Sequence, residues 1–304
     1  KLVFVLNGRE KFLQLQFYRQ WNMLKAYCKE KGVHMFGDLP FYINLNSADI
    51  WSFPEYFKLD KNKKPVRVSG VPPDYFSETG QLWGTPVYDW DRLKKDRFVW
   101  WKYRILHNFK FFDLLRLDHF RAFSACWEVP ADEETAMNGK WTDVPGEDFF
   151  RGIKRLKVDD KIIAEDLGDI DQPVVDLMKK FNFPGMKVLQ FAFESKETGN
   201  QHIPYAHDKN FVAYTATHDN NTTRGWFEKE AKKEDLKNLK YYLGREVKSS
   251  EIALQMIRMC LGSVANVAVI PVQDLLNLGQ EAIMNRPGTS NGNWKWKLMP
   301  GQLN

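Results

Sequence analysis

Six short apolar runs, separated from one another by helical patterns, constrain the fold of this 304-residue chain more than any other feature. Each run stops abruptly at a polar residue or a turn. Buried strands that alternate with amphipathic helices are typical of repeated βα units around a parallel sheet. The expected strands are His34–Gly37, Phe112–Leu117, Lys161–Ala164, Val188–Phe193, Phe211–Thr217 and Val267–Val272. The pattern therefore predicts an α/β fold.

One predicted helix precedes the first strand. Phe17, Trp21, Leu24 and Cys28 recur at spacings of four, three and four residues, which places them on one helical face. Gly32 follows where a helix end favours a left-handed residue. We expect this helix to end just before Gly32.

Two further helices have recognisable starts. Asp171 followed by Pro173 is a typical helix opening, because the carboxylate caps free N–H groups and proline fits the first turn. Ser249 or Ser250 could cap the helix that runs through Ile252 and Cys260. Both helices are predicted to connect consecutive strands.

The number of strands leaves two architectures open. Six strands are two fewer than a (β/α)₈ TIM-type barrel contains, so the chain forms either an open doubly wound sheet or a barrel without its first two βα units. The chain lacks an initiator Met and starts within an apolar run, which favours an N-terminally truncated barrel. We expect residues 1–304 to form one partial (β/α)₈ catalytic barrel.

Residues 43–88 interrupt the βα pattern. This stretch is rich in Pro, Gly, Asp and aromatic residues and keeps no sustained period. Long segments of this kind within compact domains are usually functional or disordered, and aromatic residues argue against disorder. We predict a functional insertion at the carboxyl ends of the strands.

Composition excludes several classes of protein. The net charge is +5, but the basic residues are interspersed with acids rather than gathered in a stripe, so we expect no nucleic acid partner. No run of eighteen apolar residues occurs, so we expect no membrane span. The odd number and wide spacing of the three cysteines favour a reducing compartment, by default a bacterial cytoplasm, with a plastid as the alternative. The six histidines show no paired ligand spacing, so we expect neither a metal nor a cofactor.

Three of the expected strands end in acids. Asp118, Glu165 and Asp219 each follow an apolar run, and the carboxyl ends of barrel strands share the face that carries active sites. A lone acid at a strand end is most often a cap or half of an ion pair, but three in successive βα positions favour a shared pocket. Two carboxyl groups about 5 Å apart across a glycosidic bond are the mark of a retaining glycosidase. The pattern points to a sugar-active barrel enzyme.

Basic residues adjoin these acids. Arg116 lies two positions before Asp118, and residues two apart in a strand point to the same side, so the guanidinium should keep Asp118 ionised. A structural salt bridge is the alternative for Arg116. For His119 and His218, the local pattern favours a partly buried, hydrogen-bonded imidazole.

Seven stretches give the chain a specific resemblance that runs nearly from end to end. They are GDLPFYINLNSADIW, GVPPDYFSETGQLWG, LRLDHFRAF, IIAEDLG, FPGMKVLQFAF, YTATHDNNT and QDLLNLGQEAIMNRPGTSNGNWKWKL. In this order the chain resembles the amylomaltases, or disproportionating enzymes, of glycoside hydrolase family 77 in the α-amylase clan. The resemblance implies a 4-α-glucanotransferase that acts on maltooligosaccharides and on glucans derived from starch or glycogen.

The resemblance also implies roles for individual residues. It implies Asp118 as nucleophile, Glu165 as general acid and base, and Asp219 as the carboxylate that stabilises the transition state. The implied sugar-binding residues are Asp38, Asp74, Gln81, Trp83, Arg116, His119, His218 and Asn285. Without the resemblance, Trp83 would be read as a plug between loop and barrel, and Asp38, Asp74 and Asn285 as turn residues.

Three alternatives remain at this point. A hydrolase or a phosphorylase of the same clan would carry the same three acids, and a non-catalytic glucan-binding barrel would keep the fold without turnover. We also expect the 304-residue chain to be weakly active or inactive unless the two missing strands are supplied.

Overall fold

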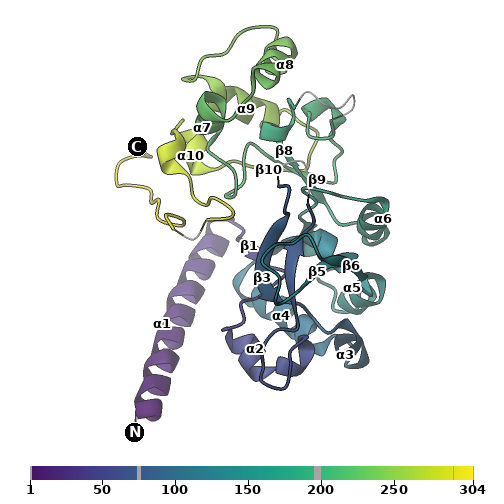
Figure 1. Ribbon diagram of the computed structural model, residues 1–304. Helices are drawn as coiled ribbons and strands as arrows, with labels where there is room; N and C mark the ends of the chain where they lie inside the picture. The colour runs from purple at the N-terminus through teal and green to yellow at the C-terminus, as the bar shows by residue number, and fades with distance from the viewer. Residues whose placement is uncertain (1, 74–76, 195–199, 290, 304) are drawn as a thin grey trace. The chain divides into compact units, whose positions relative to one another are not determined.

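The computed structural model describes residues 2–73, 77–194, 200–289 and 291–303. The chain divides into two compact units, Lys1–Phe183 and Pro184–Asn304. Each unit is built on its own three-stranded parallel sheet, and Figure 1 traces both along the chain. The parallel βα pattern predicted from the six apolar runs is confirmed.

The first unit carries its parallel sheet in the order β1-β4-β7, with bounds β1 Phe36–Leu39, β4 Leu114–Leu117 and β7 Ile162–Ala164. Asp38 is the register partner of Arg116, and Arg116 is the partner of Ile163. Register partners in a sheet point to the same side. The sheet therefore presents Asp38 and Arg116 on one side at its carboxyl end.

Helices and short 3₁₀ turns connect these strands. The α-helices are α1 Leu2–Glu30, α2 Ala48–Ser52, α3 Trp90–Lys95, α4 Val99–Phe111, α5 Gly146–Lys154 and α6 Gln172–Phe181, and the 3₁₀ turns are η1 Pro54–Tyr56, η2 Phe120–Phe123 and η3 Asp159–Lys161. Two predicted boundaries are confirmed. α1 ends shortly before Gly32, whose φ is 69°, and the Asp171 side chain accepts a hydrogen bond from Val174 N at the start of α6.

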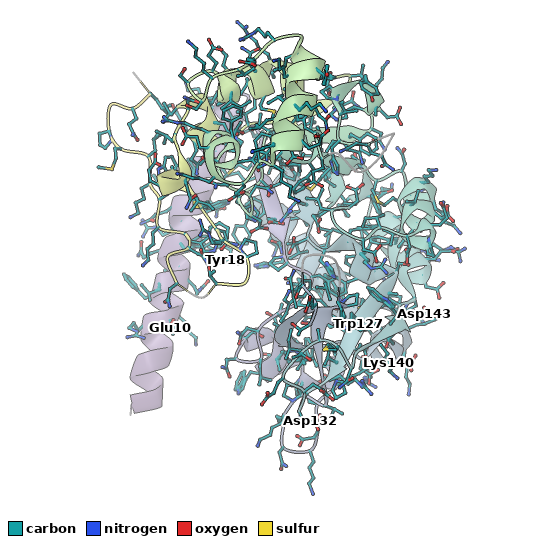
Figure 2. All side chains as sticks on the ribbon, turned by 45° about the horizontal axis from the view of Figure 1, so that its top comes forward. Glu10, Tyr18, Trp127, Asp132, Lys140 and Asp143 are labelled. Atoms are coloured by element: carbon teal, nitrogen blue, oxygen red, sulfur yellow. The ribbon has the colours of Figure 1, made fainter. Side chains whose placement is uncertain are left out.

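An antiparallel sheet that the sequence pattern did not predict covers part of the first unit. Its order is β3-β2-β5-β6, with bounds β2 Arg67–Val71, β3 Gln81–Pro86, β5 Ala125–Pro130 and β6 Lys140–Asp143. The insertion at residues 43–88 thus contains two paired strands as well as loops. Figure 2 labels Trp127 on β5 and Lys140 and Asp143 on β6, with Asp132 in the connection between them.

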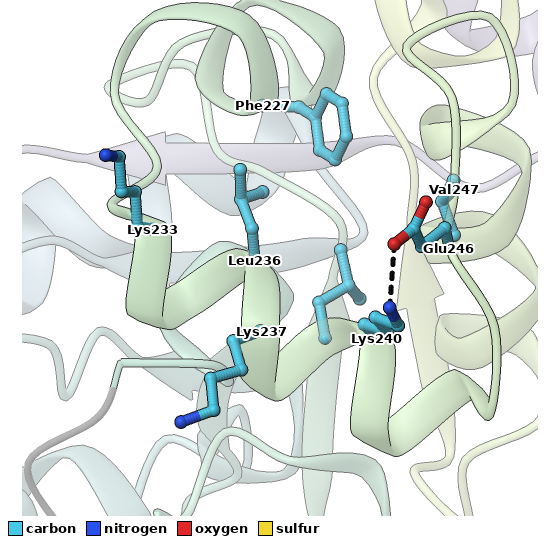
Figure 3. A pocket seen from close by; sticks show the side chains of 8 residues that line it. Phe227, Lys233, Leu236, Lys237, Lys240, Glu246 and Val247 are labelled. Carbon is cyan, nitrogen blue, oxygen red and sulfur yellow. Dashed lines mark hydrogen bonds and ion pairs between the residues drawn. The ribbon is translucent and has the colours of Figure 1, made fainter.

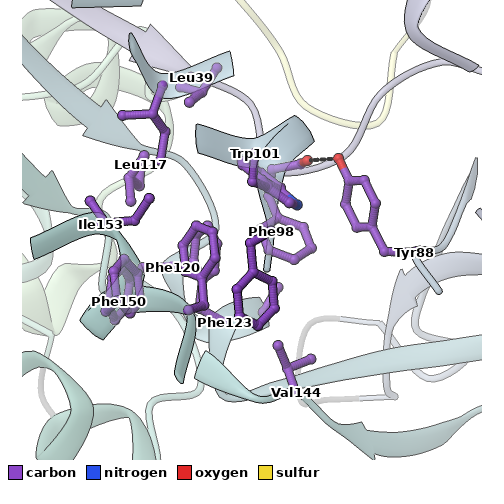
Figure 4. Close-up of a cluster of buried hydrophobic side chains, with 14 of the residues drawn as sticks. Leu39, Tyr88, Phe98, Trp101, Leu117, Phe120, Phe123, Val144, Phe150 and Ile153 are labelled. Atoms are coloured by element: carbon purple, nitrogen blue, oxygen red, sulfur yellow. Dashed lines mark hydrogen bonds between the residues drawn. The ribbon is translucent and has the colours of Figure 1, made fainter. Parts of the chain in front are cut away.

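An aromatic core holds the segment that follows β4. Phe120 and Phe123, both on η2, are fully buried. Phe123 stacks on Phe149, with ring centroids 5.0 Å apart. Phe120 stacks on Phe150, with ring centroids 5.3 Å apart, and Figure 4 labels both residues. Because aromatic side chains bury large areas, this packing fixes the backbone just after Asp118.

A buried tyrosine, Tyr88, supports the chain just after β1. The hydroxyl of Tyr88 donates a 2.6 Å hydrogen bond to the carbonyl of Phe41, drawn as a dashed line in Figure 4. Burial raises the pKa of Tyr88 far above its ordinary value. A neutral phenol thus supports the chain where it leaves β1.

The second unit carries its sheet in the order β10-β9-β8, with bounds β8 Gly185–Val188, β9 Phe211–Tyr214 and β10 Val267–Val269. Its helices are α7 Thr223–Lys229, α8 Lys233–Leu243, α9 Ile252–Leu261 and α10 Val272–Leu275, and its 3₁₀ turns are η4 Leu189–Phe191, η5 Pro204–Ala206 and η6 Gln280–Ala282. Leu239 of α8 and Met256 of α9 are buried in its hydrophobic core.

Several predictions in the second unit are wrong in detail. The strands expected at Phe211–Thr217 and Val267–Val272 end earlier, at Tyr214 and Val269, and Val272 instead begins α10. The fourth strand was expected at Val188–Phe193, but it ends at Val188, and the apolar residues that follow continue as the buried 3₁₀ turn η4. An apolar run alone does not distinguish a strand from a buried turn. Helix α9 forms as expected, but neither Ser249 nor Ser250 caps it. Its N-cap is Glu251 without a side-chain bond, after a turn in which Glu251 N donates to Lys248 O.

Within the described ranges, the structure contains no helix that is both long and apolar enough to cross a membrane.

Candidate functional site

Asp118 and Glu165 follow two neighbouring strands of the first unit. The register of β4 and β7 ends at Leu117 opposite Ala164, and Glu165 N donates to Leu117 O over 3.0 Å. One position further, Asp118 adjoins Glu165. Neighbouring strands lie about 4.8 Å apart. The sheet therefore brings together two acids that are far apart in sequence.

Arg116 holds two carboxylates at this sheet end. Its Nε and Nη2 donate to the two oxygens of Asp38 over 2.8 and 2.7 Å, and Nη2 also donates to Asp118 Oδ1 over 2.9 Å. The Arg116 side chain is buried, whereas those of Asp38 and Asp118 are 38% and 37% exposed. The predicted contact between Arg116 and Asp118 is confirmed. Burial lowers the pKa of Arg116, but Asp38 and Asp118 outweigh burial and raise the pKa above its ordinary value, so the positive charge persists.

Glu165 lies in a different environment. Its Oε2 accepts a hydrogen bond from His119 N and its Oε1 accepts one from Leu167 N, both over 2.8 Å. Burial raises the pKa of Glu165 to about 7, and the neighbouring Asp118 acts in the same direction against Arg116 and these two N–H donors. Glu165 can therefore hold a proton near neutral pH, whereas Asp118 directly contacts a fixed cation.

An aromatic cluster borders the two acids. The His119 ring lies 4.8 Å from the Trp83 ring, edge to face, and 6.1 Å from the Tyr42 ring. Trp83 is 40% exposed, so its ring is not a buried plug between the insertion and the sheet. Burial and the nearby Arg121 lower the pKa of His119 to about 4, which leaves the imidazole neutral at pH 7. Tyr42 also borders this cluster; it was not among the predicted residues, although it lies within the stretch GDLPFYINLNSADIW.

Two predicted residues belong to the insertion. Gln81 is exposed on β3, and its Oε1 accepts a hydrogen bond from Trp83 Nε1 over 3.2 Å. The structure thus places Gln81 beside the aromatic cluster. Asp74 lies outside the described residues.

Asp219 belongs to the second unit, on the segment that follows β9. Its Oδ1 accepts a 2.6 Å hydrogen bond from Asn285 Nδ2, and its Oδ2 lies 3.3 Å from His218 Nε2. Asn285 N also donates to His218 O over 3.1 Å. The structure therefore brings three predicted residues of this unit together.

The buried carboxylate of Asp274 hydrogen-bonds to both ends of the segment that carries Asp219. Asp274 is 1% exposed and accepts three hydrogen bonds, from Thr215 Oγ1 at 2.6 Å, Thr223 N at 2.8 Å and Thr223 Oγ1 at 2.6 Å. Thr215 and Thr223 flank residues 216–222, so Asp274 joins both ends of this segment. Sequence reasoning missed Asp274, because nothing in its local pattern indicates a buried partner so far away.

A surface cavity of about 390 Å³ lies elsewhere in the second unit. It is lined by Phe227, Lys233, Leu236, Lys237, Leu239, Lys240, Glu246 and Val247, and Figure 3 shows the 2.7 Å ion pair between Lys240 and Glu246. None of the strand-end acids lines it, so we place the candidate site at the strand ends instead. Among the residues with described positions, no three His, Cys, Asp or Glu side chains gather as metal ligands would.

The fold and these sites define a class of protein. Paired carboxylates in contrasting environments at the ends of parallel strands are the arrangement used by glycoside-processing α/β enzymes. The chain belongs to glycoside hydrolase family 77, whose model, described as 4-alpha-glucanotransferase, matches residues 8–302.

Individual relatives agree with this assignment. The chain is 50% identical over 287 residues to the 4-alpha-glucanotransferase of Aquifex aeolicus, covering 94% of this chain and 59% of that protein. It is 45% identical over 285 residues to a chloroplastic/amyloplastic 4-alpha-glucanotransferase of Solanum tuberosum, covering 94% and 49%. The structure of an amylomaltase from Streptococcus agalactiae in complex with acarbose matches with a TM-score of 0.90 and 40% identity, covering 95% and 58%. The chain thus spans about three fifths or less of these relatives.

Proposed function

We propose that this chain carries the catalytic machinery of a retaining 4-α-glucanotransferase, which moves an α-1,4-glucan segment to the 4-hydroxyl of an acceptor glucose or maltooligosaccharide. One observation carries the proposal. Asp118 accepts a hydrogen bond from the charged guanidinium of Arg116, while the pKa of the adjacent Glu165 is raised to about 7. A retaining mechanism needs this division between an ionised nucleophile and a protonated acid.

The first step of the proposed reaction breaks the glycosidic bond. An oxygen of Asp118 attacks the anomeric carbon while Glu165 donates its proton to the departing glycosidic oxygen. A glucosyl ester on Asp118 and a shortened glucan result, and Glu165 is left as a carboxylate. Arg116 keeps Asp118 oriented through their 2.9 Å hydrogen bond.

The second step transfers the glucosyl group. Glu165 removes the proton of the acceptor 4-hydroxyl, whose oxygen attacks the anomeric carbon and releases Asp118. Two inversions retain the anomeric configuration, and Glu165 regains its proton. We propose Asp219 as the third carboxylate, which accepts hydrogen bonds from ring hydroxyls as the sugar distorts. Its 2.6 Å bond from Asn285 supports a fixed orientation.

The remaining predicted residues are proposed to bind glucan. Trp83, Gln81 and His119 form a cluster beside Glu165. Asp38 binds Arg116. His218 and Asn285 contact Asp219. Asp74 is proposed from its motif alone. The proposed substrates are maltooligosaccharides and glucans derived from starch or glycogen.

We also propose that the six parallel strands belong to a (β/α)₈ barrel, with the insertion at residues 43–88 above the strand ends. Support comes from the TM-score of 0.90 to the Streptococcus agalactiae amylomaltase. Cytoplasm is the proposed location, with a plastid as the alternative that the name of the potato relative suggests. The buried free thiols of Cys126 and Cys260 fit a reducing compartment.

Incubation with maltotriose tests the proposed activity. Transfer predicts glucose together with oligosaccharides longer than maltotriose, at a rate independent of phosphate. Shorter products alone would identify a hydrolase, and a requirement for phosphate would identify a phosphorylase. If the intact protein binds maltotriose without converting it, the chain is a binding protein and the proposal is wrong.

A further inference from the structure

Trp294 has a backbone conformation that bulky residues rarely adopt. Its φ is 59°, in the left-handed region that favours Gly and Asn. Such conformations persist only where the surrounding structure holds them, and they cluster at functional sites. The conformation itself does not need an indole, because Asn would adopt it with less strain. The presence of Trp at this position therefore indicates a role for its indole side chain.

Several hydrogen bonds hold the segment that ends at Trp294. Trp294 N donates to Met284 O over 2.7 Å, which ties the two ends of residues 284–294 together. Arg286 N donates to Asn293 Oδ1, and Asn293 Nδ2 donates to Thr289 O, each over 3.0 Å. Hydrogen bonds to and within the preceding segment thus hold the backbone of Trp294.

The same segment is joined to the Asp219 site. Asn285 donates through its side chain to Asp219 and through its backbone to His218. The indole of Trp294 lies 5.3 Å from the His218 ring, and His218 Nε2 lies 3.3 Å from Asp219. The imidazole of His218 therefore contacts both Trp294 and Asp219, the carboxylate proposed to bind the ring hydroxyls of the sugar.

Contact with His218 leaves most of the indole open to solvent, since Trp294 is 60% exposed. An exposed aromatic face beside hydrogen-bonding groups suits a pyranose ring, which presents apolar C–H groups on its faces and hydroxyls at its edge. Asp219 and Asn285 would bind the edge, and the indole would cover a face.

We propose that Trp294 is a sugar-binding platform that packs against a glucose unit of the glucan held at Asp219. The inference rests on the proposed function and deepens it by adding a substrate contact. Because packing on a sugar face acts on bound substrate and transition state alike, Trp294 sets the affinity for glucan rather than the rate of bond cleavage.

Two substitutions at this position separate the indole from its backbone. Trp294→Asn removes the ring and suits the left-handed conformation, whereas Trp294→Phe keeps an aromatic face on the same strained backbone. Lys157→Asn is the matched control, since Lys157 is exposed, has a φ of 57° and lies in the first unit, outside both the insertion and the residues proposed for the site. It makes the same type of backbone change without touching the Asp219 site.

The test measures kcat and KM for maltooligosaccharide transfer, together with Tm, in the intact protein. We expect Trp294→Asn to raise KM about tenfold, with kcat within about twofold and Tm unchanged or higher. Trp294→Phe and Lys157→Asn should keep KM within about threefold of the original.

Each other outcome overturns the inference. An unchanged KM in Trp294→Asn means that the indole does not contact substrate. A fall in kcat alone, with an altered pH profile, means that Trp294 only positions His218. A lower Tm in Trp294→Asn means that the ring serves stability. Absence of transfer by the unsubstituted protein defeats the proposed function itself, which separates that failure from failure of the inference.

Discussion

Arg116 donates to Asp118 over 2.9 Å through the same Nη2 that donates to Asp38 over 2.7 Å. One buried cation thus orients two partly exposed carboxylates at the end of a parallel sheet. Glu165, which follows the neighbouring strand β7, accepts hydrogen bonds from the backbone N–H groups of His119 and Leu167 instead. This difference in partners supports the assignment of opposite roles to two acids of similar chemistry.

Asp118→Asn should abolish glucan transfer while leaving glucan binding nearly intact. The amide keeps the shape of the side chain but cannot form the glucosyl ester, so kcat should fall at least about 10⁴-fold. Titration calorimetry with maltoheptaose measures the binding that should remain. Persistent turnover would show that another residue is the nucleophile.

The pH dependence of kcat/KM should report the proton on Glu165. Because the pKa of Glu165 is raised to about 7, the protonated acid is lost as the pH rises through this value. We expect kcat/KM to decline above about pH 7, and Glu165→Gln to remove most activity at every pH. A rate that keeps rising from pH 7 to pH 9 would contradict the role of general acid.

The same carboxyl should make stability depend on pH. A carboxyl whose pKa is higher in the folded than in the unfolded protein stabilises the fold below about pH 4.5, and this stabilisation is lost as the pH rises through about 7. Glu165→Gln should therefore raise the free energy of unfolding at pH 8 by about 1–3 kcal/mol, relative to its effect at pH 4. Chemical denaturation at both pH values measures the difference, and an equal effect at both would argue against a raised pKa.

Asp38→Asn should lower kcat/KM about 10- to 100-fold, because Arg116 loses the charged partner that fixes its guanidinium beside Asp118. The Tm should change little, since the Asp38 side chain is 38% exposed. Glu10→Gln is a suitable control, because it removes an exposed ion pair with Arg9 on α1. If both variants retain full activity, Asp38 does not position the site.

Asp274→Ala should lower the free energy of unfolding by about 3 kcal/mol, because two buried threonine hydroxyls and one N–H lose their acceptor. Asp208→Ala, an exposed acid of the same unit, should change it by less than about 0.5 kcal/mol. Urea denaturation compares the two. Equal effects would mean that Asp274 does not fasten the segment that carries Asp219.

Local pattern was sufficient to predict the parallel strands and the acids at their ends. The runs that became β4 and β7 are apolar, short and followed directly by an acid, so burial and strand direction could be inferred without any partner. Strand β9 ends earlier than expected, at Tyr214, and Asp219 lies on the segment that follows it. The contact between Arg116 and Asp118 followed from their spacing of two residues.

Features that depend on distant pairing could not be predicted in this way. The bond from Arg116 to Asp38 depends on the register of β1 with β4, which joins residues 78 apart. Strands β2 and β3 lie in a segment rich in Pro and Gly; they pair with each other, and β2 also pairs with the distant strand β5. The left-handed backbone of Trp294 accompanies a hydrogen bond from its N–H to the carbonyl of Met284, and nothing in the residue type indicates it.

Trapping of the covalent intermediate tests the central claim most directly. A fluorinated α-glucosyl fluoride forms a glucosyl ester faster than the ester breaks down, and peptide mass spectrometry then locates the added mass. We predict the label on Asp118, with none in Asp118→Asn. A label on Glu165 or Asp219, or turnover of the reagent without any labelled peptide in a protein that transfers glucan, would contradict the assignment of the nucleophile.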